Sequence, residues 1–479
     1  MADVLLIDTN TTPFNEAFPV YPIGLDYLQG ALAKSGLGNA KILDLTRAGG
    51  PLSSRDLSER GARSLALIKQ AIDSQPWDAI GLSLRNIDST YPTLEGQAEL
   101  HHYLPQLTAY LNCVQENAAS DTHVLLGGTG FSMMPGAFLE GRPDTWHGLV
   151  GPAESAFVDT VGSIIEGKEP PRLARQGGEG ILGCLRNREL LSRYLELPIG
   201  EGTFGLRTKV GCGQACGYCP YPLINGPGQR FKDPAEVAQE LKLLASVHWE
   251  RPEPVPLRFM FADDIFNRPV AHAKAVLAAM QEEGIIPYSW HAYLDPAQID
   301  REFLELVKDT NGWCRHEHPD GSGGRAMFFP FDLESGSDRM LSRLGKPYNS
   351  EELLASVEEF QGAASDWLTR GELDHVAFGF HLLMGYPGED EASVAETCDL
   401  INRTQPHQVA VQLGVRVYPD TPLARRTRGE LWREEKDLYQ PTFVPVDENA
   451  VLGWLRQHLD AAYDRLSRKG NMLLISQGE

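Results

Sequence analysis

Three cysteines, Cys212, Cys216 and Cys219, lie in the stretch VGCGQACGYCPYP with the spacing C-x3-C-x2-C. Closed zinc and iron–sulphur sites use four protein ligands. The chain's other cysteines are isolated in the sequence, which disfavours a zinc site, and a long chain rarely needs disulfides. We interpret the three thiolates as ligands of a catalytic [4Fe–4S] cluster whose fourth iron stays open for a substrate or cofactor; a zinc knuckle, a disulfide pair and chance are the alternatives.

The segments around these cysteines alternate between strand-like and helix-like patterns. Strands are predicted over 204–210, 257–262, 287–294, 326–333, 376–385 and 408–418. Helices are predicted over 234–247, 270–284, 301–312, 337–345 and 391–404. This series predicts a partial (β/α)6 barrel over residues 201–428, with its active site at the carboxyl ends of the strands. The cysteines directly follow the first strand, at that end.

The chain before the barrel also alternates, with strands predicted over 4–8, 41–45, 79–84, 123–128 and 147–151 and helices over 23–36 and 64–75. We therefore predict an α/β, doubly wound (Rossmann-like) parallel sheet in residues 1–165, which binds ligands at its carboxyl edge. Residues 166–200 are rich in Pro, Gly and charge and are interpreted as a linker. Residues 429–479 are predicted to be a small helical region, with an amphipathic helix over 450–470.

Composition limits the partners. The chain of 479 residues has a formal net charge of −22 and no long basic run, so we expect no nucleic-acid partner. Its first residues, MADVLLIDTN, do not resemble a secretory signal, and no apolar run reaches the ~18 residues of a membrane span. We expect a cytoplasmic protein that acts on a small molecule. The oligomeric state cannot be predicted.

The cysteine motif, with Tyr218 before its last cysteine, resembles the signature of radical S-adenosylmethionine (SAM) enzymes. The resemblance covers about half of the chain, through FADDIFNRP (261–269), WHAYLDP (290–296), FDLESGSDRMLSRLGKPY (331–348), LLMGYPGEDEASVAET (382–397) and VYPDTPL (417–423). It implies that SAM binds the open iron and is cleaved reductively to a 5′-deoxyadenosyl radical. It also implies an external electron donor of the flavodoxin or ferredoxin type.

The same resemblance implies roles for individual residues. Near the SAM adenine it implies Tyr218, Gly385, Tyr386 and Pro387; near the SAM amino group, Asp263 and Asp264; near the ribose or carboxylate, Glu334 and Ser335. Trp290, His291, Tyr293 and Gln412 are candidates for the substrate cavity, although inward-facing barrel aromatics are more often core.

A doubly wound sheet before such a barrel resembles the cobalamin-binding subclass of the family. YPIGLDYLQGAL (21–32), GLSLRN (81–86), LLGGTGFSMMP (126–135) and LVGPAESAFVDTV (149–161) match the usual order of segments in that domain. The cobalamin-binding residues that this resemblance implies are Ser83, Arg85, Asn86, Gly127, Gly128, Gly151 and Glu154.

The cobalt-ligating D-x-H-x-x-G motif is missing after the first strand, where the chain reads DTNTTP (8–13). Either cobalamin binds without a protein ligand below cobalt, or the domain keeps the fold without the cofactor. In the first case Arg85 and Asn86 are placed to approach the lower face, where a guanidinium would discourage a lower ligand. The alternative for Arg85 is a structural ion pair with Asp88 or another acid.

Together these patterns predict a cobalamin-dependent radical SAM enzyme, most simply a C-methyltransferase in natural-product-type biosynthesis. The second reading is a radical SAM dehydratase, deoxygenase or cyclising enzyme of the same architecture without methyl transfer by cobalamin. The third, an electron carrier or redox sensor, is disfavoured because such proteins close their clusters with four thiolates.

Overall fold

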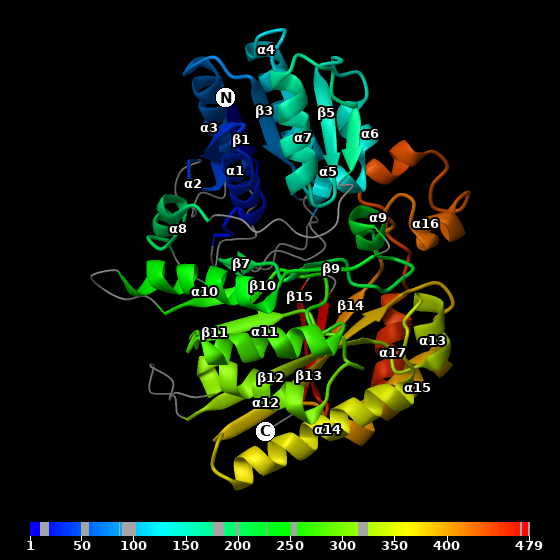
Figure 1. Ribbon diagram of the computed structural model, residues 1–479. Helices are drawn as coiled ribbons and strands as arrows, with labels where there is room; N and C mark the ends of the chain where they lie inside the picture. The colour runs from blue at the N-terminus through cyan, green and yellow to red at the C-terminus, as the bar shows by residue number, and fades with distance from the viewer. Residues whose placement is uncertain are drawn as a thin grey trace.

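The computed structural model describes residues 1–9, 19–48, 57–85, 87–88, 102–175, 186–197, 200, 202–226, 228–250, 256–314, 324–469 and 472–477. An N-terminal α/β layer lies above a larger C-terminal α/β body in the view of Figure 1, and the segment that contains α16 and α17 lies along one side. No helix within the described ranges is long and apolar enough to cross a membrane.

The N-terminal sheet is parallel, in the order β2-β1-β3-β4-β5-β6. Its strands are β1 (Ala2–Asp8), β2 (Gly38–Asp44), β3 (Ala79–Ser83), β4 (His123–Gly127), β5 (Trp146–Val150) and β6 (Leu173–Arg175). The chain winds outward in opposite directions from β1 and β3, so the carboxyl ends of these strands form the switch point at which such sheets bind ligands.

Helices cover both faces of this sheet because each strand alternates its apolar side chains between two cores. Leu5 and Ile7 of β1 pack with α3 (Leu57–Asp73) and α4 (Leu104–Asn117). Val4 and Leu6 pack with α1 (Ile23–Ser35) and α7 (Glu154–Ile165) on the opposite face. The doubly wound sheet predicted from the sequence is therefore confirmed. The short helices α2 (Leu45–Ala48), α5 (Thr129–Met133) and α6 (Pro135–Leu139) complete this layer.

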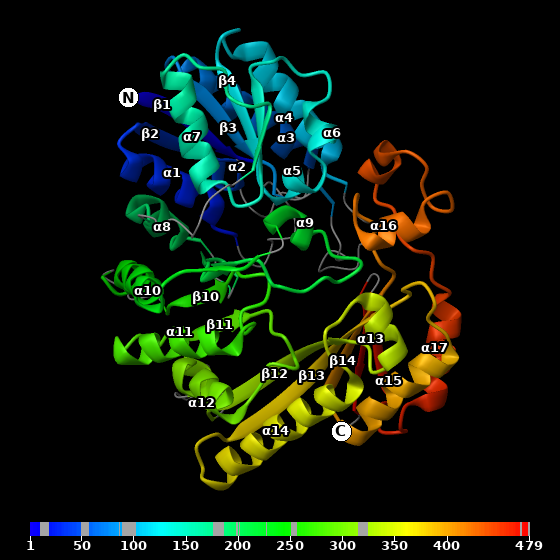
Figure 2. The same cartoon turned by 45° about the vertical axis from the view of Figure 1, so that its right-hand side comes forward.

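The C-terminal body contains the predicted six barrel strands, hydrogen-bonded as two groups. The first group is β7 (Gly205–Leu206), β10 (Arg258–Phe261) and β11 (Ser289–Ala292); the second begins with β12 (Ala326–Glu334), β13 (His375–Met384) and β14 (Gln408–Leu413). Helices α10 (Pro234–Trp249), α11 (Val270–Glu282), α12 (Arg301–Thr310), α13 (Asp338–Leu344), α14 (Ser350–Thr369) and α15 (Glu391–Thr404) connect them. Figure 2 shows these helices along the outside of the strands.

The structure differs from the sequence prediction at the C-terminus. The helix expected over 450–470 is α17 (Glu448–His458) and ends twelve residues early, because β15 (Arg465–Lys469) and β16 (Met472–Ser476) follow it. β16 pairs antiparallel with β14 and β15 with β16. These strands satisfy the backbone edge that β14 would otherwise expose, so this region is not wholly helical.

Two further boundaries differ. The stretch predicted as a linker contains β6, which extends the N-terminal sheet, and α8 (Arg188–Tyr194), whose apolar side is buried. The strand predicted over 204–210 is divided into β7 and β8 (Lys209–Val210), and β8 forms a hairpin with β9 (Arg230–Phe231). Short helices complete the C-terminal body. α9 (Tyr221–Asn225) follows the cysteine segment, and α16 (Pro422–Thr427) and η3 (Glu435–Tyr439) belong to the segment along the side of the barrel. η2 (Gly312–Cys314) follows α12.

Candidate active site

The cysteine segment forms a loop between β8 and α9, at the carboxyl end of the first barrel strand as predicted. Gly211 and Gly213 adopt left-handed backbone angles, with φ of 85° and 71°. A Cβ atom on Gly211 would lie 2.4 Å from the carbonyl oxygen of Gly228. Glycine is therefore required where this loop leaves the strand.

Gly217 anchors the loop to two later segments of the barrel. Its N–H donates to the carbonyl oxygen of Leu344 at 2.7 Å, and its own carbonyl accepts from the N–H of Leu423 at 2.8 Å. A Cβ on Gly217 would lie 2.5 Å from Tyr386 Oη. Glycine is needed here for close packing and not for a left-handed turn.

The three thiols have the burial and the mutual proximity expected of cluster ligands. Cys216 is buried, Cys212 and Cys219 are half-buried, and the thiols lie close enough to affect one another's ionisation. Burial raises the pKa of each thiol, that of Cys219 to about 12. A positively charged centre is therefore what would keep all three ionised.

The arrangement fits a cluster better than a single ion. Among the described residues, no three Cys, His, Asp or Glu side chains converge on one position that could hold a metal ion. Cysteines that bind a [4Fe–4S] cluster each ligate a different iron, so they need not converge. The donor set fits a [4Fe–4S] cluster, with Cys212, Cys216 and Cys219 as its ligands.

A largely buried ion pair, Glu334 and Lys346, lies beside the cysteine loop. Glu334 Oε1 accepts hydrogen bonds from Tyr218 Oη at 2.6 Å and from Lys346 Nζ at 2.9 Å. Glu334 has a left-handed φ of 67°, and the Lys346 side chain is only 6% exposed. Lys346 also interacts with the Cys216 thiol, whose pKa it lowers against the larger effect of burial. The structure thus joins Tyr218 to Glu334 and adds Lys346, which lies in the quoted segment 331–348 but was not singled out.

Asp263 and Asp264 both follow β10 but make different contacts. Asp263 accepts from the N–H groups of Thr208 and Lys209 at 2.8 and 3.1 Å and from Thr208 Oγ1 at 2.5 Å. It therefore holds the backbone that leads into the cysteine loop, and burial raises its pKa to about 6. Asp264 accepts from Asn225 Nδ2 at 2.6 Å and faces a cavity, described below.

The remaining predicted SAM residues pack around the later loops. Ser335 is buried, with its Oγ 3.2 Å from Thr397 Oγ1. Gly385 has a φ of 98° and donates its N–H to Glu389, while the carbonyl of Pro387 accepts from Arg343 at 3.3 Å. The structure thus places Ser335 inside a helix–strand junction and only Tyr386, through Gly217, directly against the cysteine loop.

A cavity of about 490 Å³ lies between the N-terminal sheet and the barrel. All the described residues that were predicted to bind cobalamin line it: Ser83, Arg85, Gly127, Gly128, Gly151 and Glu154. Asp263, Asp264, Lys209 and Tyr221 line it from the barrel side. The two halves of the predicted site, which are far apart in the sequence, therefore share one cavity.

The shape of this cavity suits a large cofactor with an apolar part. Part of its wall consists of Leu25, Leu28, Leu125, Leu149 and Phe157, between the sheet and helices α1 and α7. Gly128, with φ 94°, would place a Cβ 2.7 Å from the Leu84 carbonyl oxygen. Gly151, with φ 79°, would place one 2.5 Å from the carbonyl oxygen of Ile224 in α9. Glycine is therefore required where the backbone packs closely at the carboxyl edge of the sheet, and it adds no side chain to the cavity, so the residues present fit a corrinoid.

The alternative of an ion pair between Arg85 and Asp88 is not what the described residues form. Asp88 pairs instead with Arg416 of the barrel at 2.9 Å, and both side chains are buried. Arg85 is exposed and lines the cavity. Asn86, and Asn10–Pro13 of the stretch that replaces the histidine motif, lie outside the described residues.

Of the four substrate candidates, one lines the cavity. Tyr293 is 51% exposed and faces it. Trp290 is core, in edge-to-face contact with Phe261 and Phe266, and its indole N–H donates to Thr310 Oγ1 at 3.2 Å. His291 and Gln412 lie on the strands β11 and β14 and do not line this cavity.

Besides the Asp88–Arg416 pair, two further ion-pair groups join the halves around the cavity. Arg186 binds Asp26 of α1 and Glu240 of α10, both at 2.6 Å. Glu154, at the start of α7, pairs with Arg207, between β7 and β8. The sequence analysis did not predict a role for either arginine, because local sequence patterns do not indicate which residue more than fifty positions away will be the partner.

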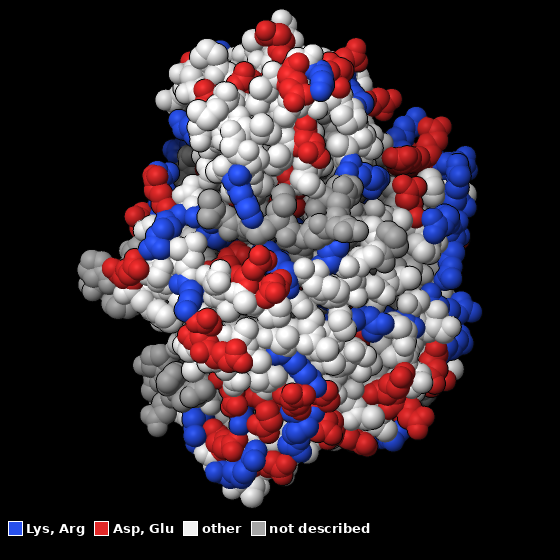
Figure 3. Space-filling view, in the orientation of Figure 1, with Lys and Arg blue, Asp and Glu red and all other residues white. Residues whose placement is uncertain are grey.

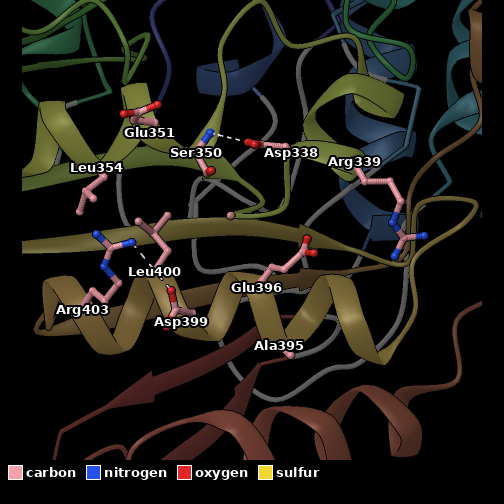
Figure 4. A pocket seen from close by; sticks show the side chains of 11 residues that line it. Asp338, Arg339, Ser350, Glu351, Leu354, Ala395, Glu396, Asp399, Leu400 and Arg403 are labelled. Carbon is pink, nitrogen blue, oxygen red and sulfur yellow. Dashed lines mark hydrogen bonds and ion pairs between the residues drawn. The ribbon is translucent and has the colours of Figure 1, made fainter.

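Another hollow, of about 730 Å³, lies outside the barrel between α13, α14 and α15 (Figure 4). Its charged groups are largely engaged with one another or with the backbone: Asp338 accepts from the Ser350 N–H at 2.6 Å, and Arg403 pairs with Asp399 at 3.9 Å. It shares no residue with the cavity or with the cysteine loop, and we assign it no part in the site.

No protein-family model matches the chain. The chain is 23% identical over 195 residues to the tRNA-2-methylthio-N(6)-dimethylallyladenosine synthase of Natranaerobius thermophilus, and the match covers 41% of this chain and 38% of that protein. It is 27% identical over 218 residues to the enzyme with the same name from a Parafrankia species, covering 45% and 39%. The matched region thus spans about two fifths of the length of these relatives.

Solved structures match over nearly the whole chain. The radical SAM methyltransferase TsrM from Kitasatospora setae, with tryptophan and a SAM analogue bound, superposes with a TM-score of 0.65 at 20% identity, covering 90% of this chain and 77% of that one. The cobalamin-dependent radical SAM enzyme OxsB, with aqua-cobalamin and SAM bound, gives 0.58 at 13% identity, covering 100% and 64%. The protein has the fold shared by these two enzymes, which confirms the architecture inferred from the sequence.

Proposed function

We propose that this protein is a cobalamin-dependent radical SAM enzyme that transfers a methyl group to a carbon atom of a small molecule. The observation that carries the proposal is the single cavity that joins the glycine-rich edge of the N-terminal sheet to the barrel mouth beside the three-cysteine loop. The fold shared with TsrM and OxsB, whose structures contain cobalamin, supports it.

The residues of this chain would divide the work as follows. Cys212, Cys216 and Cys219 would hold a [4Fe–4S] cluster, which supplies an electron to cleave SAM. Tyr218, Glu334 and Lys346 offer polar groups beside the cluster loop, and Asp264 offers a carboxylate at the cavity wall. Burial raises the pKa of Asp264 through loss of hydration, whereas the Asn225 hydrogen bond and the nearby Lys209 and Arg207 lower it.

The N-terminal residues would bind a corrinoid, which supplies the methyl group. Gly127, Gly128 and Gly151 leave room at the edge of the sheet, and Leu125, Leu149 and Phe157 offer an apolar wall. Arg85 follows β3, lines the cavity and has no acidic partner among the described residues, so its guanidinium would be available to a bound corrinoid. The enclosing domains would keep reactive species away from water.

The test is anaerobic purification after iron and cobalamin reconstitution, with iron, sulphide and corrinoid quantified per chain. We expect one [4Fe–4S] cluster and one corrinoid, and loss of the cluster in Cys216→Ala but not in Cys314→Ala, a buried cysteine outside the loop. With substrate, methyl transfer yields S-adenosylhomocysteine as well as 5′-deoxyadenosine.

Iron and SAM binding without corrinoid would replace this proposal with the second reading, a radical SAM dehydratase, deoxygenase or cyclising enzyme. Failure of SAM to perturb the EPR spectrum of the reduced cluster would favour the electron carrier or sensor. Because the sequence relatives are named for tRNA modification, transfer RNA is tested as a substrate beside small molecules; the net charge of −22 supports the small molecule.

A further inference from the structure

One side of the barrel carries a group of exposed arginines although the protein as a whole is strongly acidic. Figure 3 shows Lys and Arg gathered along the edge where α16 lies, while the lower part of the same view carries Asp and Glu interspersed with Lys and Arg. The group consists of Arg343, at the end of α13, and Arg425, Arg426 and Arg428, in or just after α16. We call these four residues the arginine patch.

The patch keeps its positive charge available. Among the described residues its four guanidinium groups form no ion pair; Arg425 donates to the Asp420 carbonyl at 2.7 Å, and Arg428 lies over the Trp432 ring at 5.3 Å. The carboxylates at and just before η3 are already engaged: Glu434 pairs with Lys436, Glu435 accepts from Tyr439 Oη at 3.3 Å, and Asp437 accepts from the backbone. A positive surface therefore persists in a protein with a net charge of −22.

The patch lies directly over the cysteine loop. Arg426 Nη1 is 3.4 Å from Tyr386 Oη, and that hydroxyl packs against Gly217 of the loop. Leu344, next to Arg343, and Leu423, in α16, make the two hydrogen bonds that hold the backbone of Gly217. One buried tyrosine ring therefore separates the charged surface from the residues between Cys216 and Cys219.

We propose that the arginine patch is the docking surface for an acidic, low-potential one-electron carrier protein of the ferredoxin class. This inference rests on the proposed [4Fe–4S] cluster. Opposite charge steers an acidic carrier to this face and orients it, and small polar interfaces are typical of transient electron-transfer complexes. The carrier loses one electron and the cluster gains it; no bond is made or broken and no proton moves.

The test uses the full chain, a plant-type [2Fe–2S] ferredoxin and the variant Arg425→Glu/Arg428→Glu. Among the described residues, neither side chain hydrogen-bonds to Tyr386 or to the cysteine loop, so we expect the loop to be preserved. The control, Lys34→Glu/Lys41→Glu, makes the same change in net charge at exposed positions of the N-terminal layer. Two quantities are measured at low and at physiological ionic strength: the Kd for ferredoxin by calorimetry, with and without the cluster, and the stopped-flow rate constant of cluster reduction.

In the arginine variant we expect a Kd at least about tenfold higher, a reduction rate at least about tenfold lower and a flatter salt dependence, since electrostatic steering contributes ~10- to 10³-fold. The lysine control should stay close to the wild type. Equal losses in both variants would show an effect of net charge alone and would overturn the proposal, as would an unchanged Kd and rate.

The other possible occupants give distinct results. If the arginine variant lost transfer-RNA binding or self-association while its reaction with ferredoxin was unchanged, the patch would serve RNA or a second copy of the chain, and the proposal would be wrong. Reduction by dithionite, followed by EPR, separates the two levels of inference. If dithionite reduces no cluster, the proposed function is refuted. If the cluster is reducible but substitutions in the arginine patch do not change its reduction by ferredoxin, only the docking surface is refuted.

Discussion

Replacing Arg186 with methionine should loosen the contact between the N-terminal sheet and the barrel. The Arg186 side chain is fully buried; it binds Asp26 and Glu240 at 2.6 Å each and donates to the Gly205 carbonyl at 3.2 Å. These three partners lie in α1, α10 and β7. Methionine keeps much of the length of the side chain and removes the charge and all three hydrogen bonds.

The size of the effect follows from what each partner keeps. Glu240 retains Lys232 at 2.8 Å, whereas Asp26 retains the Asn187 N–H at 2.8 Å but no cation among the described residues, so Asp26 becomes a buried charge without a counter-ion. Removing one partner of a buried ion pair costs ~3–5 kcal/mol. Since one of the two acids stays paired, we expect about 3 kcal/mol, the low end of that range. At ~1.4 kcal/mol per tenfold, this raises the local opening equilibrium by about 100-fold.

The assay is native-state hydrogen exchange read by mass spectrometry on peptides that cover α1 and α10. The matched control is Arg188→Met, because Arg188 and its partner Glu250 are 50% and 65% exposed. An exposed pair of this kind contributes below ~1 kcal/mol, so the control should change exchange little.

The pH dependence gives a second test of the same reasoning. Burial raises the pKa of Asp26 above its ordinary value, and Arg186 opposes that rise. Without Arg186 the folded-state pKa rises further, so the variant is stabilised by protonation at low pH and loses that stabilisation as the pH rises through the folded pKa. Exchange in α1 should therefore exceed that of the wild type by more at pH 8 than at pH 5. A change below about threefold at pH 8, or one as large in Arg188→Met, would refute the inference that the Arg186–Asp26 pair stabilises the contact between the two halves.

Three further outcomes follow from the site. Gly345 has a φ of 78°, and a Cβ there would lie 2.7 Å from a carbonyl oxygen of the cysteine loop, so Gly345→Ala should reduce the iron content after reconstitution by at least half. Gly371 is also left-handed but lies in open space, so Gly371→Ala should leave the iron content unchanged. Equal iron in both variants would contradict this reasoning. Lys346→Met leaves Glu334 without its cation and should raise the Kd for SAM, measured by calorimetry, at least about tenfold, since hydrogen bonds to charged groups contribute ~1.5–3 kcal/mol. Lys346→Arg should recover part of the lost SAM affinity. Burial raises the pKa of Glu389 to about 7, so ionisation of Glu389 destabilises the fold as the pH rises from ~4.5 through 7. The melting temperature of Glu389→Gln, relative to that of the wild type, should therefore increase from pH 5 to pH 8. A difference in melting temperature that stays constant with pH would argue against this effect of burial.

Much of the architecture could be predicted because it is written in local patterns. Alternating strands and helices in both halves correspond to the observed elements, mostly within a few residues. The error at 450–470 has a physical cause: the pattern suited a helix, but β14 needed a partner for its backbone edge, and β16 lies far from it in the sequence. A local pattern contains no information on which edge remains open.

The candidate site divides in the same way. The spacing of Cys212, Cys216 and Cys219 by itself determined an incomplete ligand set and its place after a strand, because both depend on neighbouring residues alone. Only the tertiary structure decided that Asp263 binds the backbone that leads into the loop while Asp264 binds Asn225, although the two are adjacent in sequence and both line the cavity. Likewise only folding brought Lys346 to Glu334 and Arg186 to Asp26. Such contacts depend on how separate elements pack, and buried charges become partners only where packing removes them from water.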